Sequence, residues 1–383
     1  MVCTDAFKKI DEVYKNYFKM WEDCCNIESP TNFKEGVDKV GKYFADLAEQ
    51  RGWKVEYSKQ EVSGDAVCIT MNADVNARPI SLSGHMDTVH PVGLFGTPAV
   101  RFDEEKIYGP GVRDCKGGIV IGFLVMDVLE SLGYRERPVQ LLLQSDEETS
   151  STGSNKATIK YICEKSKDAV VFFNMESSGG TTFTMSRKGI LTYEFEVTGQ
   201  EGHSSRCATE GANAIVDAAY KMIELDKLKD DDGITCNCGI VSGGSVVNTI
   251  PGKCIFKVNF RYKTNEQAEW IENYVKELAA TPHVEGTSCT VKELGRRVAM
   301  EKTDFNEKLL ERVNEIYAEN GIETLTPVAL RGGSDGADVT SCGIPCIDSI
   351  GVIGGASHSV NEYAYLDSLA KTAKRIIAVI YNI

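Results

Sequence analysis

Residues 139–154 read VQLLLQSDEETSSTGS, and this run sets the architecture of the chain. Its first six residues are almost purely apolar, which is typical of a strand buried on both faces of an α/β sheet. Three consecutive acidic residues, Asp146, Glu147 and Glu148, follow at the carboxyl end of that strand. Burying carboxylates there is costly unless a metal and a proton-transfer role compensate them. Because adjacent side chains diverge, one glutamate could bind metal while its neighbour handles water.

Helices and strands alternate on both sides of this run. Apolar residues at helical spacing predict two helices, Val37–Glu49 and Gly117–Leu132. Short apolar runs predict further strands at Val67–Met71, Ile80–Gly84 and Ala169–Asn174. Helices between apolar strands indicate a sheet covered on both faces, so we expect an α/β domain.

The pattern changes near Lys188, and the α/β alternation resumes only after about Val298. Between these points the order is β-α-β-β-α-β, which is one split-βαβ unit. The predicted elements are, in chain order, Leu191–Thr198, Asn213–Leu225, Cys236–Ser242, Lys253–Tyr262, Glu266–Ala280 and Ser288–Glu293. The simplest interpretation is one catalytic domain, residues 1–187 and 299–383, with a small α+β domain of residues 188–298 inserted into it.

Composition limits the classes of protein and partner. The chain has 383 residues, of which 42% are hydrophobic and 26% charged. These values are ordinary for a folded protein of about two domains and exclude wholesale disorder. No apolar run reaches the roughly 18–20 residues that a membrane span needs, so we expect no membrane partner. The net charge of −14 argues against nucleic acid as a partner.

The first twenty residues, MVCTDAFKKIDEVYKNYFKM, carry charges throughout and do not resemble a secretory signal. Apolar residues from Phe7 to Phe18 instead predict an amphipathic helix. The thirteen cysteines are odd in number and follow no repeated framework, which favours reduced thiols and a cytoplasmic location. Cys236 and Cys238 are either half a zinc site or plain strand residues, and the lack of a second pair at finger spacing favours the strand.

Two motifs carry a histidine and two aspartates. SGHMDTVHP, residues 83–91, lies at the carboxyl end of a predicted strand, where ligand sites of open α/β sheets gather. His85 and Asp87 face the same side of an extended chain, so Asp87 could hold one tautomer of His85 while its other ring nitrogen binds metal. In GPGVRDCKGG, residues 109–118, Asp114 precedes a helix. A helix-capping role and a phosphate loop are alternatives there, although Walker spacing is missing.

Two more motifs complete the set. FFNMESSGG, residues 172–180, places Glu176 after another apolar strand, and GASHSVNEYA, residues 355–364, places His358 in a glycine-rich loop. The chain has five histidines, at positions 85, 90, 203, 283 and 358. Taken together, two histidines and three carboxylates at strand ends indicate a two-metal site.

These five motifs, in this order and spacing, resemble the zinc-dependent glutamate carboxypeptidase family, which includes aminoacylases, succinyl-diaminopimelate desuccinylase and bacterial di- and tripeptidases. The resemblance runs from about Val37 to the end of the chain. NTIP (248–251), NFRY (259–262) and RGGSDGAD (331–338) are most similar to the glutamate carboxypeptidase branch. The resemblance implies a zinc-peptidase-like catalytic domain, whose mixed sheet has helices on both faces. It also implies a ferredoxin-like inserted domain that serves as lid and dimerisation domain.

The resemblance further implies two Zn²⁺ ions, and the same ligands would tolerate Co²⁺ or Mn²⁺. One ion would take His85, Asp114 and Glu176. The other would take Asp114, Glu148 and His358, so that Asp114 bridges the two.

The remaining residues of the motifs receive supporting roles from the same resemblance. Glu147 would be the general base and then the general acid, and Asp87 would orient His85. Cys115 stands where several family members carry an acidic or small residue, and it is either a soft extra donor or a packed side chain. We favour packing. His90 occupies a position that the family does not use as a ligand.

In the inserted domain, His203 matches the histidine that reaches the partner's active site in dimeric members and helps to stabilise the oxyanion. Asn248 and Arg261 match residues that contact substrate, and the fork of Arg261 suits a carboxylate. Gly332 and Gly333 are expected to shape the substrate pocket through exposed backbone amides. A homodimer formed through the inserted domain is therefore expected.

The implied reaction is hydrolysis of a peptide or amide bond next to a free carboxylate, in a small peptide or an N-acyl amino acid. A carboxypeptidase, with glutamate as one candidate for the released residue, is the first hypothesis. An N-acyl-amino-acid deacylase or a di- or tripeptidase is the alternative. A non-catalytic metal-binding protein with the same fold is a remote third.

Overall fold

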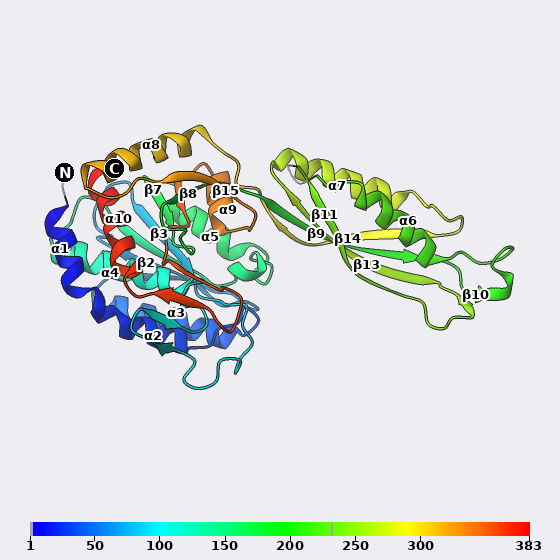
Figure 1. Cartoon of the computed structure of the whole chain (residues 1–383), viewed down its shortest axis with the longest axis horizontal. Coiled ribbons are helices and arrows are strands. Elements are labelled where there is room, and N and C mark those ends of the chain that lie inside the picture. The colour runs from blue at the N-terminus through cyan, green and yellow to red at the C-terminus, as the bar shows by residue number, and fades with distance from the viewer. Residues whose placement is uncertain (1–2, 231–232) are drawn as a thin grey trace. The chain divides into compact units, whose positions relative to one another are not determined.

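The computed structural model describes residues 3–230 and 233–383. The chain forms two compact units (Figure 1). The larger unit comprises Met1–Met185, Lys302–Ala329 and Ser334–Ile383, and the inserted unit comprises Ser186–Glu301 with Leu330–Gly333. Among the described residues, no helix combines the length and the apolar character that crossing a bilayer requires.

The larger unit is built on a six-stranded sheet in the order β1-β2-β6-β3-β7-β16. These strands span Lys54–Ser58 (β1), Ala66–Met71 (β2), Val139–Gln144 (β6), Ile80–His85 (β3), Val171–Asn174 (β7) and Cys346–Asp348 (β16). β3 runs parallel to β6 and β7, and β16 runs parallel to β7, whereas β2 is antiparallel to both β1 and β6. The predicted mixed sheet is confirmed.

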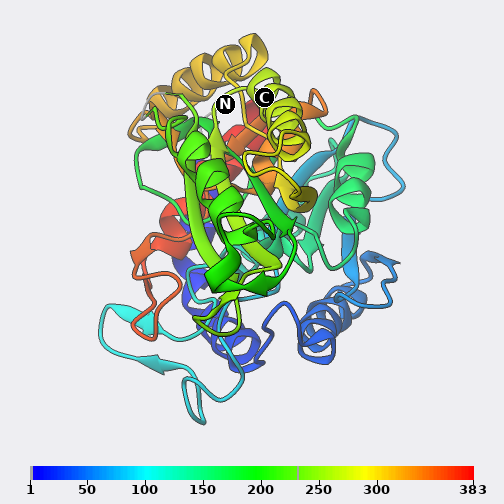
Figure 2. The same ribbon diagram turned by 90° about the vertical axis from the view of Figure 1, so that its right-hand side faces the viewer.

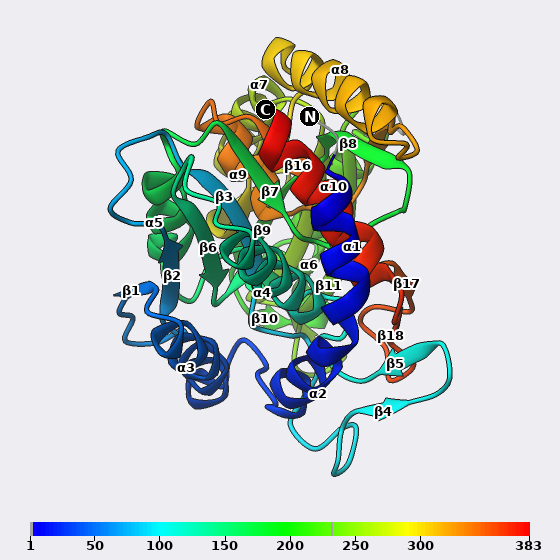
Figure 3. The ribbon, with the colours of Figure 1, turned by 90° about the vertical axis from the view of Figure 1, so that its left-hand side faces the viewer.

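Helices cover both faces of this sheet, as predicted (Figure 3). One face packs against α3 (Lys34–Gln50) and α4 (Lys116–Ser131), and α10 (Ser368–Asn382) packs on α4. The other face packs against α5 (Ala157–Ser166) and α9 (Asp335–Ser341). Nearly every residue of α4 is buried, because this apolar helix lies between the sheet and α10.

The amino-terminal segment differs from the single amphipathic helix that its pattern predicts. α1 (Thr4–Val13) and α2 (Phe18–Asn26) are separated by a 3₁₀ turn, Tyr14–Tyr17. Tyr17 at the end of this turn donates a hydrogen bond of 2.7 Å to Asp127 on α4. Both helices and the turn pack on α4, so the break lets the segment follow the surface of that buried helix. Residues 1–2 of this stretch lie outside the described residues.

A small second sheet in the larger unit positions two loops. Its order is β17-β18-β5-β4, with strands Gly354–Gly355 (β17), Tyr363–Tyr365 (β18), Lys106–Tyr108 (β5) and Arg101–Phe102 (β4). The loop that begins at Gly109 leaves the end of β5, and the loop 356–362 joins β17 to β18. Because β5 and β18 are paired, the Asp114 loop and the His358 loop start from neighbouring strands. α8 (Asp304–Glu319) belongs to the same unit, as do all but the last residues of the paired strands β8 (Thr182–Arg187) and β15 (Thr326–Leu330).

The inserted unit has the predicted β-α-β-β-α-β order. Its antiparallel sheet, β11-β13-β9-β14, consists of β9 (Gly189–Thr198), β11 (Thr235–Gly243), β13 (Lys253–Tyr262) and β14 (Ser288–Arg297). Figures 1 and 2 show α6 (Ala214–Asp226) and α7 (Asn265–Ala280) along this sheet. Alternate residues of β9 and β13 are buried against the helices, which explains the alternating sequence. A separate pair, β10 (Gly202–His203) and β12 (Thr249–Ile250), completes the unit.

Candidate functional site

The five predicted metal ligands come from five segments of the larger unit. His85 is the last residue of β3, and Glu176 lies two residues beyond β7. Glu148 lies in a 3₁₀ turn, Glu147–Thr149, that follows β6. Asp114 precedes α4, and His358 lies in the loop between β17 and β18. Because β3, β6 and β7 are parallel, their carboxyl ends meet at one edge of the sheet.

Asp114 lies between the two histidines. Its Oδ1 is 3.1 Å from His85 Nε2, and its Oδ2 is 3.4 Å from His358 Nε2. His358 Nε2 is also 3.4 Å from Glu148 Oε2, and His85 Nε2 is 3.6 Å from Glu176 Oε1. Each oxygen of the Asp114 carboxylate therefore faces a different imidazole, and each imidazole faces one further glutamate.

Burial differs across this cluster. His85 is 2% exposed, and Asp114, Glu148 and Glu176 have side chains between 8% and 15% exposed. His358 is 57% exposed, so it closes the cluster from the solvent side. One ligand atom each from His85, Asp114 and Glu148 lie within 4.8 Å of one another, a spacing that one cation could fill.

Asp87 links His85, in the motif of residues 83–91, to the turn that carries Glu147 and Glu148. The nearest partner of His85 Nδ1 is the backbone carbonyl oxygen of Asp87, at 2.9 Å, while Asp87 Oδ1 is 3.3 Å away. The two Asp87 oxygens accept hydrogen bonds from the backbone N–H groups of Glu147 and Glu148, at 3.2 and 3.1 Å. Thr31 Oγ1 donates a third, at 2.6 Å. The buried Asp87 thus fixes both His85 and the turn that carries the two glutamates.

Asp146 is fully buried, and hydrogen bonds from other residues of the chain offset the cost of burying its carboxylate. Its carboxylate accepts hydrogen bonds from the backbone N–H of Ser154, at 2.8 Å, and from Thr158 Oγ1, at 2.6 Å. These bonds hold the loop that follows β6. Of the three consecutive acidic residues, therefore, Asp146 is structural, while Glu147 and Glu148 lie in the turn at the cluster.

The charges of the cluster are strongly coupled. Burial opposes ionisation of Asp114, but hydrogen bonds from His358 and His85 outweigh it and hold the pKa of Asp114 well below its usual range. The same contacts with Asp114 and Glu148 raise the pKa of His358 to about 10. Burial raises the pKa of Glu148 to about 7, against the hydrogen bond from His358. The carboxylates thus demand positive charge at this position, as imidazolium protons or as cations that displace them.

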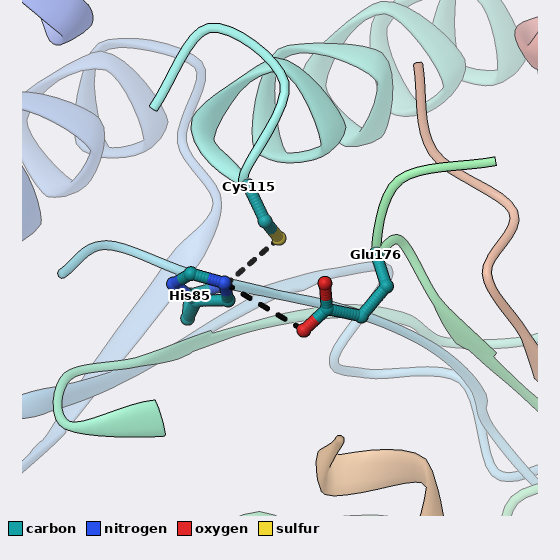
Figure 4. A group of neighbouring side chains, drawn as sticks. All are labelled: His85, Cys115 and Glu176. Atoms are coloured by element: carbon teal, nitrogen blue, oxygen red, sulfur yellow. Dashed lines mark hydrogen bonds and ion pairs between the residues drawn. The ribbon is translucent and has the colours of Figure 1, made fainter. Parts of the chain in front are cut away.

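Cys115 lies beside His85 and Glu176, and Figure 4 shows these side chains directed toward one another. Its sulfur accepts a hydrogen bond from the backbone N–H of His85, at 3.3 Å, and donates one to the carbonyl oxygen of Met175, at 3.5 Å. The thiol is fully buried, and burial raises its pKa to about 12. Both hydrogen-bonding functions of the thiol are satisfied by backbone, as in a packed side chain.

The inserted unit brings His203 and Asn248 together. His203 pairs with Thr249 between β10 and β12, and the backbone N–H of Ser204 donates to the carbonyl oxygen of Asn248 at 3.0 Å. His203 Nδ1 lies 2.8 Å from Ser205 Oγ at the start of a short 3₁₀ turn, Ser204–Arg206. The side chains of both His203 and Asn248 are exposed within the unit.

Arg261 lies elsewhere in the inserted unit, near the end of the ten-residue strand β13. Eight residues of extended strand separate it from Lys253 at the other end, which is about 26 Å. In the part of the chain that the structure describes, the Arg261 guanidinium has no hydrogen-bond or ion-pair partner, and burial lowers its pKa.

Gly332 and Gly333 lie in the segment Leu330–Gly333 of the inserted unit. Both of their carbonyl oxygens accept hydrogen bonds from Arg187 Nη1, at 3.0 and 3.5 Å. A Cβ on Gly333 would lie 2.4 Å from Arg297 Cδ and 3.3 Å from Ile190 Cδ1. Ile190 is paired with Arg261 across the sheet, so Gly333 and Arg261 lie at the same end of the unit.

Sequence reasoning missed the buried carboxylate of Glu362. It contacts His90 and the backbone of Asp114, and it is 1% exposed. Glu362 was visible within the last motif only as one acidic residue in a polar loop, and nothing in the spacing distinguishes a buried glutamate from a solvated one.

Comparisons with known proteins identify similar sequences and folds. The model of peptidase family M20/M25/M40 matches residues 81–382. Carboxypeptidase G2 of Pseudomonas sp. (strain RS-16) is 27% identical over 355 residues, which cover 91% of this chain and 84% of that protein. Acetylornithine deacetylase of Myxococcus xanthus is 32% identical over 255 residues, or 60% of this chain and 63% of that protein. The crystal structure of a tripeptidase from Staphylococcus aureus shares the fold, with a TM-score of 0.78, 21% identity and coverage of 96% and 97% of the two chains.

Proposed function

The chain belongs to peptidase family M20/M25/M40, a family of metallo-exopeptidases and amidohydrolases, and from this premise we propose its reaction. We propose that it hydrolyses a peptide or amide bond next to a free carboxylate, as a zinc-dependent carboxypeptidase. The observation that carries the proposal is the Asp114 carboxylate, whose two oxygens face two different histidines.

The donor set fits a pair of divalent cations. Two imidazole nitrogens and three carboxylates are the ligands that zinc accepts, and the three carboxylates offset three of the four positive charges that two dications carry. His85, Asp114 and Glu176 would hold one ion, and Asp114, Glu148 and His358 the other. Bound there, the ions would polarise the scissile carbonyl and lower the pKa of water. Cobalt or manganese would suit the same ligands.

Glu147 is proposed as the proton carrier because it lies in the same 3₁₀ turn as the candidate ligand Glu148. Its backbone is fixed by the hydrogen bond to Asp87, and its side chain belongs to a residue that is 8% exposed. We assign to it the transfer of a proton from water to the leaving amine, as base and then as acid. Asp87 supports this role because it anchors the same turn while orienting His85.

Arg261 is the proposed clamp for the substrate carboxylate. A half-buried guanidinium without a partner among the described residues is costly, and a bidentate carboxylate would satisfy it. Gly332 and Gly333 lie at the same end of the unit and are proposed to shape the pocket. Asn248 is proposed as a further contact with substrate.

A homodimer through the inserted unit is proposed on two observations. First, α6 exposes Ile215, Val216, Tyr220 and Ile223, each between 37% and 55% exposed. β11 is the edge strand of the sheet and exposes Ile240 and Val241, each 59%. A second copy would cover this apolar helix face and pair with the open edge.

The second observation concerns the two ends of β13. His203 and Asn248 lie beyond one end, and Arg261 lies near the other, about 26 Å away. One inserted unit therefore presents its two sets of candidate residues to different places. In a dimer, His203 of the partner subunit could stabilise the oxyanion while Arg261 binds the carboxylate of the same substrate.

A cytoplasmic location is proposed from the thiols. All thirteen cysteines are free, and eight of them are buried. Free thiols in this number suit a reducing compartment.

The alternatives differ in the bond that is cut. An N-acyl-amino-acid deacylase is favoured by the similarity to acetylornithine deacetylase, and a di- or tripeptidase would use the same metal site. Both need a free carboxylate, so Arg261 does not separate them from a carboxypeptidase. A non-catalytic metal-binding protein remains the remote alternative.

The experiment that tests the proposal measures free amino acid released from a panel, with zinc-loaded and chelated protein in parallel. The panel holds N-acyl amino acids, α- and γ-glutamyl conjugates, compounds with a carboxy-terminal glutamate, dipeptides and tripeptides. Zinc-dependent release of a carboxy-terminal residue is expected. Preference for short acyl groups or for free dipeptides would contradict the carboxypeptidase proposal in favour of its alternatives. No turnover by protein that holds two zinc ions would contradict all three.

The dimer has its own test. Gel filtration with multi-angle light scattering should give about twice the chain mass of 42.0 kDa. Replacing Ile223 by Asp on the exposed face of α6 should shift the mass toward one chain, whereas Lys276→Ala on the exposed face of α7 should leave it unchanged. A mass of about 42 kDa for the unmodified protein would refute the dimer.

A further inference from the structure

Glu362 lies at the meeting point of three segments that carry the metal ligands. It is four residues beyond His358 in the loop before β18, and its side chain is 1% exposed. Its Oε1 accepts hydrogen bonds from the backbone N–H groups of Arg113 and Asp114, at 2.9 and 3.1 Å. Its Oε2 lies 3.0 Å from Nε2 of His90, which belongs to the motif that carries His85.

The backbone of Glu362 strengthens the same junction. Its carbonyl oxygen accepts a hydrogen bond from Gly109 at 3.3 Å, at the start of the loop that leads to Asp114. Arg113 makes a parallel link, because its Nη1 donates to Ser357 Oγ next to His358. The loops of Asp114 and His358 are thus joined along their length and not at one point.

His90 contributes a buried donor to this junction. It is 6% exposed, and its ring packs edge-on against Phe95, with centroids 4.9 Å apart. With its ring placed by Phe95, the imidazole can direct Nε2 at Glu362. His90 therefore has a defined hydrogen-bond partner, Glu362. It is not one of the candidate metal ligands, unlike His85 in the same motif.

We propose that Glu362, held by His90, is a positioning residue for the bridging aspartate. The inference rests on the proposed function, because it assumes that Asp114 holds both ions. The backbone N–H of Asp114 is fixed by the Glu362 carboxylate, so the angle at which Asp114 presents its two oxygens depends on a residue that touches neither ion. Without that carboxylate, two partly buried N–H groups and one buried imidazole would lose this hydrogen-bond partner. Outer residues that orient metal ligands typically change metal affinity by about 10- to 100-fold when removed.

The test uses cobalt as the probe, in the full chain. Cobalt binding is measured by competition with a chelator, and the visible absorption bands report ligand geometry. We expect Glu362→Ala to weaken cobalt affinity by about 10- to 100-fold and to shift the bands. Glu362→Gln keeps an acceptor for the two N–H groups, and a change of His90 tautomer can restore the third contact. It should therefore recover most of the affinity.

A matched control separates positioning from a general loss of stability. Asp127 on α4 also accepts three side-chain hydrogen bonds, from Tyr17 and from two nitrogens of Arg51, and its side chain is 20% exposed. Asp127→Ala should lower the melting temperature of the chelated protein while leaving the cobalt affinity and spectrum unchanged. Where Glu362→Ala does not fold, His90→Ala takes its place, with a smaller loss of affinity expected.

The outcomes are decisive in both directions. The proposal is overturned if Glu362→Ala, or His90→Ala in its place, binds cobalt with unchanged affinity and spectrum. It is overturned equally if Asp127→Ala causes the same loss. Hydrolysis is not needed for either reading. Unmodified protein that binds two cobalt ions but cleaves nothing in the substrate panel would refute the proposed reaction and leave the positioning role standing.

Discussion

In the larger unit, Asp114 contacts His85 and His358 directly, whereas in the inserted unit Arg261 has no partner among the described residues. The ring of His203 contacts Ser205 of its own loop. The candidate metal ligands therefore all come from the larger unit, from strand ends and the loops beside them. The candidate substrate residues are presented on exposed or unpaired positions that a ligand or a second subunit must complete. The candidate metal ligands are thus brought together within one unit, whereas the proposed substrate residues have no such neighbours among the described residues.

Replacing Glu147 by Gln should have the largest effect of these substitutions, and it tests the candidate metal cluster of the larger unit. Turnover should fall by about 10²- to 10⁴-fold, because the amide cannot accept the proton from water. Metal content, measured by atomic emission, should stay that of the unmodified enzyme because the proposed ligands remain. Glu164→Gln is the control, since the Glu164 side chain is 69% exposed and, among the described residues, pairs with Lys167 alone. Turnover within tenfold of the unmodified enzyme would remove Glu147 from the mechanism.

Asp217 and Lys221 form a buried ion pair in the inserted unit, and breaking this pair should destabilise that unit. Asp217 and Lys221 on α6 are both fully buried, with Oδ2 and Nζ 3.4 Å apart. Asp217 Oδ1 accepts the backbone N–H groups of His283 and Val284, at 2.6 and 3.0 Å. Asp217→Ala should cost about 3–5 kcal/mol, since it leaves a buried ammonium without its counter-ion. Urea unfolding followed through Trp270, which lies on α7, measures this loss.

The same pair gives a pH dependence with a definite sign. Burial opposes ionisation of Asp217, but the hydrogen bonds from His283 and Val284 outweigh it and lower the pKa of the carboxyl. Its contribution is therefore complete above the unfolded pKa of about 3.9 and is lost as the pH falls through the folded pKa. Asp226→Asn, at an exposed position of the same helix, should show neither effect. An Asp217 variant that also loses metal would break the separation between the two units.

The sequence singles out the residues of the candidate metal cluster, but it does not reveal the contacts that hold them. Strand ends carry His85 and Glu176 because apolar runs stop there, and that pattern is visible without a structure. The carboxylates of Asp87 and Glu362 accept backbone N–H groups from distant segments, and the sequence contains no record of those partners. Asp146 is the opposite case. Its place in an acidic run suggested a metal or proton-transfer role, but its hydrogen bond from Ser154 holds the loop that follows β6. Long-range hydrogen bonds decide each of these cases.

The secondary structure was also predictable only where the sequence itself carries a pattern. The strand β6 was predictable because burial on both faces gives an apolar run, and β9 because burial on one face gives an alternating sequence. The two-residue strands β10 and β17 were not, since so short a run has no period and exists only through its partner. The 3₁₀ turn at Tyr14–Tyr17 was missed because packing on α4, and not local propensity, interrupts the helix.

Substitutions of Arg261 test the proposed substrate residues of the inserted unit. Arg261→Ala should raise KM by about 10- to 150-fold for a substrate with a free carboxylate, the equivalent of about 1.5–3 kcal/mol for a charged hydrogen bond. The carboxamide analogue should be cleaved poorly by both proteins, with little further loss in the variant. Arg261→Lys keeps the charge without the fork and should fall between them. An equal loss on acid and amide would show that Arg261 supports the fold and does not bind the carboxylate.

The smallest effect is expected at Cys115, where the metal cluster borders the hydrophobic core. Its sulfur lies within 4.8 Å of ligand atoms of His85 and Glu176, a spacing that coordination would also produce. The thiol is nevertheless engaged by backbone on both sides, accepting from His85 N–H and donating to Met175. A metal would have to displace the second of these bonds and take a proton from a thiol whose pKa burial raises to about 12. Packing is the simpler account, so Cys115→Ala should cost only about 1 kcal/mol for the lost contacts.

Cobalt absorption separates packing from coordination at Cys115. A packed thiol gives the cobalt-loaded protein no sulfur-to-metal charge-transfer band, and the Cys115→Ala spectrum should match that of the unmodified protein. Cys68→Ala, at another fully buried thiol in the larger unit, is the control for the stability change. A charge-transfer band that disappears in Cys115→Ala but persists in Cys68→Ala would make the thiol a ligand. In that case the metal site would include Cys115 as well as Asp114, the residue that directly precedes it before α4.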